Sequence, residues 1–428
     1  MVYENTLEFA KKQDAADPLK SYREQFYFPR MHGREVVYFT GNSLGLQPKS
    51  TQDYVLNELE DWATFGVEGH FHARSPWMPY HEQFAAPVAK IVGALPEEVV
   101  IMNQLTVNLH LMMVSFYRPT KERCKILCEA RAFSSDQYAI ESQVKYHGYT
   151  PSEAVLEVSP RPGEHCIRHE DIISTIEKHG DSIALILIGG VNYYTGQVFD
   201  MKNITAAGHR AGAMVGFDLA HAAGNLKLQL HDWDVDFACW CTYKYLNSGP
   251  GSVGGVFIHQ RNLNIENTHR FAGWWGHNKQ SRFKMEKGFD PMPTAEAWQL
   301  SNAPVLSMSA HKASVDIFDK VGMDALVSKA EKLTGYLEFI VDEINKDQKL
   351  AAGQDGYLEI ITPRDKKQRG CQLSIVAHGR GKALFNKLTE AGVISDWREP
   401  NVIRCAPVPL YNSFEDVFRF GEILKNSL

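Results

Sequence analysis

The residues best suited to chemistry lie between positions 214 and 255. One apolar run ends at Asp218, with His221 three residues later, and a second ends just before Tyr243 and Lys244. Short apolar runs bounded by turn residues are typical of buried strands in an α/β sheet. Polar groups just past the carboxyl ends of such strands lie where these sheets bind ligands. The sequence therefore predicts a site that combines an acid, a histidine and a lysine.

These residue types suit a pyridoxal phosphate site. A lysine in its free amine form condenses with the cofactor's aldehyde to give a Schiff base, and Lys244 is placed to do this. Asp218 would lie under the pyridine nitrogen and keep it protonated, which makes the ring an electron sink. His221 would pack on the ring or fix the aspartate. A lone aspartate and lysine are more often a turn cap and a surface charge, so the surrounding residues decide the assignment.

Three glycines in the same stretch imitate a dinucleotide-binding motif. Gly249, Gly251 and Gly254 have the GxGxxG spacing, but that motif needs a strand before it and a helix after it. Here a strand-like segment, 253–259, follows the glycines. We therefore interpret them as a flexible turn behind Lys244.

The composition is that of an ordinary globular protein. Hydrophobic residues make up 44% and charged residues 22% of 428 residues, enough for two domains. The net charge of −6 indicates neither a nucleic-acid-binding nor a membrane-binding protein. No apolar run approaches the roughly 18 residues of a membrane helix, and the N-terminus lacks a signal-peptide core. We therefore expect a cytoplasmic protein whose seven scattered cysteines are reduced.

The order of elements predicts the fold that must position this site. Strands and helices alternate across residues 95–260, which favours an α/β fold with a mostly parallel sheet flanked by helices. A smaller α+β domain follows. We expect an N-terminal segment (1–60) that packs on the small domain, a large cofactor-binding domain (61–310) and a small C-terminal domain (311–428).

Two helix starts could serve the cofactor. Leu105 and Thr106 open a helix after a strand, and a helix N-terminus with a hydroxyl favours a phosphate, unless Thr106 is merely a cap. The segment 133–136 also precedes a helix, and its phenylalanine and aspartate could stack on and hydrogen-bond the pyridine. Alone, it would be only a capped helix.

Other polar residues have weaker patterns. The turn 40–48, with Asn42 and Ser43, could close over a substrate or simply join a strand to a helix. His70 is one of three histidines in the loop-like segment 66–82, where no cysteine or carboxylate completes a ligand set, so we expect no metal. Arg404, on a predicted strand, is shaped to grip a carboxylate, although a surface ion pair is the alternative.

Together these motifs resemble the kynureninase family, which is dependent on pyridoxal phosphate and has the aspartate aminotransferase fold (fold type I). The resemblance runs in family order over nearly the whole chain. It implies a seven-stranded type of sheet in the large domain and a homodimer with active sites at the subunit interface. The matching stretches include YFTGNSLGLQPK (38–49), FSSD (133–136), FDLAHAAGN (217–225), CTYKYLNSGPG (241–251) and IRCAPVPLYNSF (403–414).

The resemblance also implies residue roles. Lys244, Asp218 and Tyr243 would be catalytic, with Tyr243 as a candidate proton relay. Trp274 and Asn302 would come from the partner subunit. The implied cofactor-binding residues are Leu105, Thr106, Phe133, Ser135, Asp136, Asp218, His221, Tyr243, Lys244, Trp274 and Asn302. The implied substrate-binding residues are Arg404, His70, Ser301, Asn302, Asn42 and Ser43.

The implied reaction is hydrolytic Cβ–Cγ cleavage of L-kynurenine, L-3-hydroxykynurenine or both. The products are anthranilate or 3-hydroxyanthranilate plus L-alanine, in tryptophan breakdown or nicotinamide nucleotide synthesis. His70, Ser301 and Asn302 resemble the set in relatives that prefer the hydroxylated substrate. Gly189 departs from relatives with a serine there, and Trp275 from those with a phenylalanine. The alternatives are another fold type I lyase, such as a cysteine desulfurase-like enzyme, or a non-catalytic protein on the same scaffold.

Overall fold

The structure is a computed structural model that describes residues 2–263 and 268–428. By their contacts these fall into two units. The larger unit comprises residues 51–190 and 199–320, and the smaller unit comprises residues 1–50, 191–198 and 321–428. The three-part division expected from the sequence remains a prediction.

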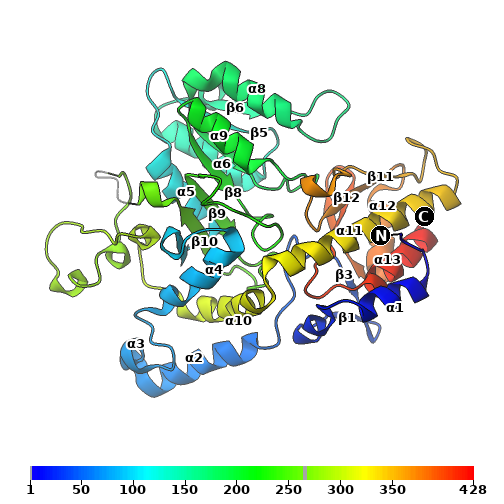
Figure 1. The fold of residues 1–428 in the computed structure, drawn as a ribbon, viewed down its shortest axis with the longest axis horizontal. Coiled ribbons are helices and arrows are strands. Elements are labelled where there is room, and N and C mark those ends of the chain that lie inside the picture. The colour runs from blue at the N-terminus through cyan, green and yellow to red at the C-terminus, as the bar shows by residue number, and fades with distance from the viewer. Residues whose placement is uncertain (1, 264–267) are drawn as a thin grey trace. The chain divides into compact units, whose positions relative to one another are not determined.

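A seven-stranded sheet organises the larger unit (Figure 1), in the order β4-β10-β9-β8-β7-β5-β6. Only β10 runs antiparallel to its neighbours, so the mostly parallel sheet predicted from the sequence is confirmed. The strands are nearly continuous apolar runs because both faces of the sheet are covered. They are β4 (Val99–Met102), β5 (Lys125–Glu129), β6 (Val155–Val158), β7 (Ile183–Gly189), β8 (Met214–Asp218), β9 (Phe237–Cys241) and β10 (Gly254–Ile258).

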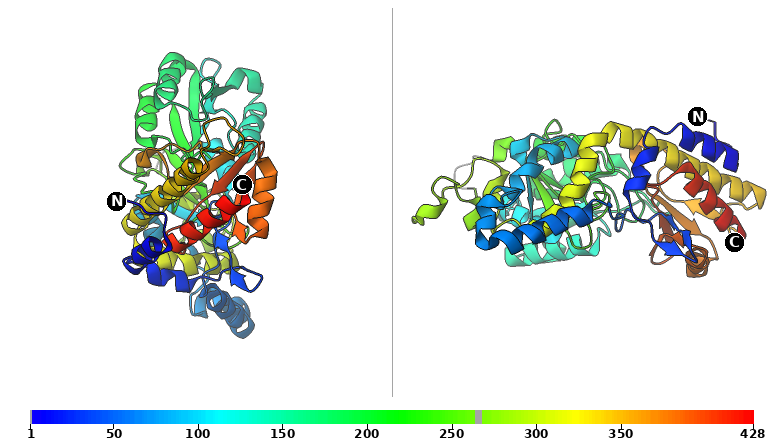
Figure 2. Two further views of the ribbon diagram at one scale, coloured as in Figure 1. Left: turned by 90° about the vertical axis from the view of Figure 1, so that its right-hand side faces the viewer. Right: turned by 90° about the horizontal axis from the view of Figure 1, so that it is seen from below.

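Helices flank this sheet on both faces (Figure 2). One pair that packs together is α5 (Leu105–Phe116) with α6 (Ser134–Tyr146), and another is α8 (His169–His179) with α9 (Met201–Arg210). Rings such as Phe116 and Phe237 stack in the core, with centroids 4.8 Å apart. The remaining helices of this unit are α2 (Thr51–Phe65), α3 (Gly69–His72), α4 (Ala85–Val92), α7 (Pro151–Ala154) and α10 (Val305–Val321).

Two loop predictions can be compared with this unit. Gly249 and Gly251 have φ of +91° and +64°, as a glycine turn allows, and β10 follows them. Within the predicted loop 66–82, however, α3 is a short helix. Tertiary packing explains the difference, because a Cβ on Gly69 would lie 2.4 Å from the Trp77 ring. That close approach holds a helical turn which hydrophobic periodicity does not predict.

A four-stranded antiparallel sheet, β11-β12-β15-β14, organises the smaller unit. Its strands are β11 (Leu358–Ile360), β12 (Leu373–Ala377), β14 (Asp396–Arg398) and β15 (Val402–Cys405). Its helices are α1 (Leu7–Ala15), α11 (Met323–Asp347), α12 (Gly381–Glu390) and α13 (Phe414–Ser427). Short pairs join β1 (Arg30–Met31) to β2 (Arg34–Glu35), and β3 (Val37–Tyr38) to β13 (Val393–Ile394).

Both ends of the chain lie in the smaller unit (Figure 1). Asp14, at the end of α1, accepts hydrogen bonds from the backbone N–H groups of Phe414 and Glu415, at 2.7 and 3.0 Å. The aspartate therefore caps the start of α13 and fastens the N-terminal segment to the C-terminal helix. Among the described helices, none is long and apolar enough to cross a membrane.

Candidate active site

The carboxyl ends of three neighbouring strands bring polar groups together. Asp218 ends β8, Gly189 ends β7 and Glu129 ends β5. Gly189 pairs with Asp218 in the parallel register, and its N–H lies 3.2 Å from both carboxylate oxygens of Glu129. The Asp218 carboxylate accepts a 2.7 Å bond from the N–H of Ala220, which fixes its orientation. The strand order thus gathers residues that are far apart in the sequence.

Lys244 follows β9 and faces this edge. Its Nζ lies 3.0 Å from Nε2 of His221 and 5.8 Å from the centroid of the Phe133 ring. His221 is buried, in the turn after β8. An amine, an imidazole and an aromatic face therefore meet at one point of the larger unit.

The acids beside Lys244 are crowded. Asp136, in the first turn of α6, is hydrogen-bonded to Asp218. Burial raises the pKa of Asp218, and the charge of Lys244 opposes that rise. Burial and the neighbouring Asp218 hold the pKa of Asp136 well above its usual range. Two buried carboxyls this close share a proton, because both cannot ionise without repulsion.

Glu129 is a third acid of this cluster, and the sequence analysis missed it. Its burial raises its pKa to about 7, and the charge of Asp218 adds to the rise. A signal was present, since a carboxylate ends the apolar strand at 125–129 as Asp218 ends its own. Glu129 and Asp218 become neighbours only because β7 lies between their strands.

A helix start and two hydroxyls lie beside this cluster. The first turn of α5 begins at Leu105, and the side chain of the N-cap residue Gln104 does not bond to it. The hydroxyls of Thr106 and Ser135 lie 2.7 Å apart, which joins the starts of α5 and α6. Backbone N–H groups and the helix dipole favour an anion at such a position.

The phenol of Tyr243 stays protonated next to this cluster. Burial, the adjacent Cys241 and the charge of Asp218 raise the pKa of Tyr243 above its ordinary value. A phenol that keeps its proton can donate it only to a more basic atom. Tyr243 therefore keeps its proton in this environment and can donate a hydrogen bond.

The residues fit pyridoxal phosphate. The buried Oδ1 of Asp136 meets no hydrogen-bond donor among residues 2–263 and 268–428. A buried acceptor in this state indicates a missing donor. An amine, an aromatic face, an acid pair and a helix start of this kind match the aldehyde, ring, ring nitrogen and phosphate of the cofactor.

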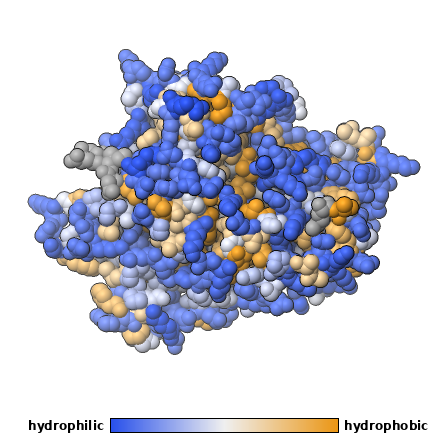
Figure 3. Space-filling model, viewed as in Figure 1, coloured by the Kyte–Doolittle hydropathy of each residue, from blue (hydrophilic) through white to orange (hydrophobic). Residues whose placement is uncertain are grey.

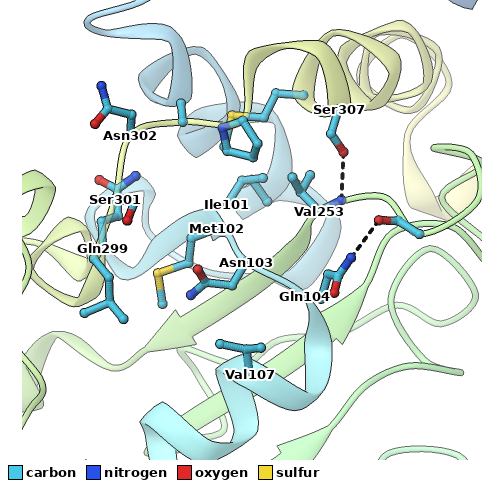
Figure 4. Close-up of a pocket in the computed structure, with 15 residues that line it drawn as sticks. Ile101, Met102, Asn103, Gln104, Val107, Val253, Gln299, Ser301, Asn302 and Ser307 are labelled. Carbon is cyan, nitrogen blue, oxygen red and sulfur yellow. Dashed lines mark hydrogen bonds between the residues drawn. The ribbon is translucent and has the colours of Figure 1, made fainter.

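Other predicted residues form a second group in the larger unit. Ser301 and Asn302 are exposed and line a cavity of about 390 Å³ together with Gln299 and Gln104. Figure 4 shows Gln299, Ser301 and Asn302 along one extended segment at the rim of this cavity. Their exposure leaves these side chains accessible to a ligand or a neighbouring chain.

His70 lies close to this second group. Its Nδ1 is 2.9 Å from the carbonyl of Val67, and its ring meets Trp77 edge-on at 5.4 Å. Trp77 lines an apolar cavity with Ala303 and Pro304, which also line the cavity of Ser301 and Asn302. The structure therefore relates His70 to the segment 301–304 through one tryptophan.

Trp274 lies on a firmly held loop with its ring exposed. Its Nε1 donates to the carbonyl of Arg282, at 3.1 Å, and the residue is 41% exposed. The guanidinium of Arg282 lies 4.4 Å from the ring centroid of the buried Trp275. The departure noted at Trp275 thus supplies a larger aromatic surface for Arg282.

The predicted substrate residues Arg404, Asn42 and Ser43 belong to the smaller unit. Arg404, on β15, is buried; its Nη1 donates to the carbonyl of Tyr193 at 2.6 Å, and its Nη2 pairs with Asp396 at 2.7 Å. Asn42 is fully buried, while Ser43 is half-buried in the adjoining turn. Each group of predicted residues is therefore assembled inside one unit.

Family models and curated relatives agree on what this chain is similar to. A model of the aminotransferase class-V family matches residues 37–356, and one of the kynureninase C-terminal domain matches residues 326–424. A kynureninase from Flavobacterium psychrophilum is 59% identical and covers 100% of this chain and 99% of its own. Kynureninases from Myxococcus xanthus and Nematostella vectensis are 55% and 48% identical, covering 99% and 97% of this chain and 98% and 93% of theirs.

Solved structures with the same fold are more distant in sequence. An apo cysteine desulfurase from Thermococcus onnurineus NA1 has a TM-score of 0.73 at 17% identity, covering 100% of this chain and 99% of that one. A cysteine desulfurase from Escherichia coli has a TM-score of 0.72 at 15% identity, covering 96% and 97%. These show the fold, whereas the full-length identities decide the family: the chain belongs to the kynureninase family.

Proposed function

We infer that this chain hydrolyses the Cβ–Cγ bond of L-kynurenine, L-3-hydroxykynurenine or both, with pyridoxal phosphate as cofactor. The observation that carries this is the meeting of Lys244 with the Asp218–Asp136 acid pair, inside a chain up to 59% identical to kynureninases. A desulfurase-like lyase is not favoured, because desulfurases are similar at only 15–17% identity.

The chain's own residues can hold the cofactor and move protons around it. Lys244 would hold the aldehyde, the start of α5 with Thr106 the phosphate, and Phe133 one face of the ring. When bound, the cofactor withdraws electrons from the substrate's amino-bearing carbon. Asp218 would face the ring nitrogen; the Ala220 N–H orients its carboxylate, and the charge of Lys244 opposes the rise of its pKa on burial.

Proton transfers at the substrate fall to two residues of this site. The amine of Lys244 takes the proton from the substrate's α-carbon, which is the task of a general base. Tyr243, whose phenol keeps its proton, supplies one to the carbon left after the bond breaks. Arg404 grips the α-carboxylate, because a guanidinium matches a carboxylate with two parallel hydrogen bonds.

The test follows both products. Purified protein with added cofactor is expected to be yellow and to release fluorescent anthranilate from kynurenine, with one alanine for each anthranilate. Alanine formed without anthranilate, or no reaction with either substrate, would exclude this function. Comparing kcat/KM for the two substrates tests the polar set His70, Ser301 and Asn302, which we expect to favour the hydroxylated one. A hydrogen-bonding pocket rewards a ring hydroxyl, and preference for kynurenine would reject that assignment.

We further propose a homodimer whose active sites combine both chains. Trp274, Ser301 and Asn302 are exposed and belong to a different group from Lys244 within the larger unit. Apolar side chains gather at the lower left of Figure 3, where α2 and α3 lie, and those exposed along α2 are Leu56, Leu59, Trp62 and Phe65. Apolar stripes of this kind are typical of protein interfaces.

Subunit mixing tests the shared site. Lys244→Ala and Asn302→Ala chains, dissociated and reassociated together, are expected to regain activity, because one site of each hybrid dimer carries both wild-type residues. Mixtures no more active than the separate variants would reject the shared site. We also propose a cytoplasmic location and domain limits at 1–60, 61–310 and 311–428, which cell fractionation and limited proteolysis test.

A further inference from the structure

Arg404 is held from two sides by residues that the sequence analysis did not single out. In the β14–β15 register, Asp396 stands directly opposite Arg404, and their side chains pair at 2.7 Å. The carbonyl of Tyr193 accepts a second bond, from Nη1, at 2.6 Å. Only 1% of the Arg404 residue surface is exposed. The guanidinium is therefore fixed by a cross-strand charge and a backbone carbonyl.

The carbonyl of Tyr193 also connects Arg404 to Asn42. The side chain of Gln372 donates to this carbonyl at 3.1 Å and accepts from Nδ2 of Asn42 at 2.9 Å. Gln372 and Asn42 are both buried, and the buried Oδ1 of Asn42 meets no donor among residues 2–263 and 268–428. One hydrogen-bonded chain thus links Asn42, Gln372, Tyr193, Arg404 and Asp396.

Asp396 also neutralises part of the positive charge in this network. Its Oδ1 lies 3.0 Å from Nε of Arg398, so one carboxylate stands between two guanidinium groups. The three side chains together keep one net positive charge. A cluster of this charge attracts a carboxylate without leaving a second buried cation unpaired.

We propose that Asp396 and Gln372 are positioning residues, which hold Arg404 and Asn42 in the arrangement that receives the α-carboxylate of the substrate. The proposal rests on the carboxylate-binding role given to Arg404 under the proposed function. Its physical basis is preorganisation: a long arginine side chain fixed before binding loses less conformational entropy when the ligand arrives. A misplaced guanidinium loses the two-bond geometry that a carboxylate requires.

Kinetics of Asp396 variants test the proposal. Asp396→Ala is expected to raise KM roughly 10- to 100-fold while kcat changes little, because ground-state binding of the carboxylate is lost but the proton-transfer groups are not. Asp396→Asn keeps an oxygen toward Arg404 and should fall between this variant and the wild type. Gln372→Met keeps the size of the side chain without its hydrogen bonds and should raise KM less than Asp396→Ala.

A product supplies a readout without turnover. L-Alanine carries the same α-carboxylate, so its inhibition constant should rise in parallel with KM. Glu359→Gln is the matched control, because it removes a carboxylate paired with His378 at 2.8 Å in the same sheet and should leave KM unchanged. Thermal midpoints measured for every variant separate weaker binding from unfolding. If Asp396→Ala does not fold, Asp396→Asn replaces it in the kinetic test.

Two outcomes overturn different claims. If Arg404→Lys raises KM but neither Asp396 variant does, the positioning role is wrong while the role of Arg404 stands. If Arg404→Lys also leaves KM unchanged, the carboxylate-binding role in the proposed function fails first. If an Asp396 variant lowers both kcat and the thermal midpoint but leaves KM unchanged, Asp396 has only a structural role.

Discussion

The two units of this molecule bury charged groups in opposite ways. In the larger unit, two acids, Asp136 and Asp218, lie near one amine, Lys244, and a third acid, Glu129, lies near Asp218. In the smaller unit, buried cations are instead paired with carboxylates. Examples are Lys329 with Asp17 at 2.7 Å, Arg404 with Asp396 at 2.7 Å and Arg369 with Glu338 at 2.5 Å.

The difference separates proton chemistry from positioning. Burial raises the pKa of all three acids, that of Glu129 to about 7, so this cluster can hold and exchange protons. A matched ion pair instead keeps both charges and fixes the geometry of the two side chains, at the cost of strong destabilisation when one partner is lost. We therefore propose that the reaction takes place at the cluster of acids near Lys244. The ion pairs of the smaller unit would position the groups that bind the substrate.

The largest effect should come from the single cation of the acid cluster. Lys244→Ala is expected to lower turnover on the order of 10⁴-fold, because it removes both the cofactor's amine and the general base. The measurement is kcat together with the absorbance band of the bound cofactor, which should disappear. Lys145→Ala, an exposed lysine of the same unit, is the control. Survival of the band in Lys244→Ala would contradict the Schiff-base role.

The next effect tests the paired charges. Asp17→Ala leaves Lys329 buried without its partner, and burial already lowers the pKa of Lys329. We expect a loss of about 3–5 kcal/mol in the free energy of unfolding, measured by urea denaturation. The double variant Asp17→Ala/Lys329→Met should recover much of this loss. A single variant as stable as the wild type would show that the pair does not hold the smaller unit.

A neutral group at the edge of the acid cluster gives a smaller effect. Tyr243→Phe removes a phenol whose pKa is raised by burial, Cys241 and Asp218. If it is the proton donor to the product carbon, kcat should fall about 100-fold. Cys241→Ser, which changes the neighbour but keeps the phenol, is the control. Unchanged turnover in Tyr243→Phe would exclude the relay and leave Tyr243 as packing.

The smallest effect concerns pH and stability. Because folding raises the pKa of Glu129 to about 7, its stabilising contribution is full below the ordinary glutamate pKa and is lost as pH rises through 7. The apo protein should therefore lose about 2 kcal/mol between pH 5 and pH 8, and Glu129→Gln should lose less. Unfolding at both pH values measures this, with the exposed Glu141→Gln as the control. Equal pH dependence in wild type and Glu129→Gln would refute it.

Local patterns predicted the parts of the site that follow one another in the chain. Asp218, His221, Tyr243 and Lys244 are predicted because each follows an apolar run at a strand end. Other residues of the proposed site could not be predicted from apolar runs at strand ends. The short segment 393–398 holds two strands, β13 and β14, which pair with different partners. Asp396 therefore faces Arg404 for a reason that hydrophobic alternation within one segment cannot supply.

The sequence by itself predicted a set of candidate reactive side chains, the alternation that builds a mostly parallel sheet, and the family. The side chains and the alternation depend on residue type and short spacing, whereas the family follows from the resemblance of motifs along nearly the whole chain. Only the tertiary structure decided that Glu129 joins Asp218 across β7, and that Gln372 and Asp396 hold Arg404. The physical reason is strand order: it brings residues far apart in the chain within hydrogen-bond distance, and no local preference encodes which strands become neighbours.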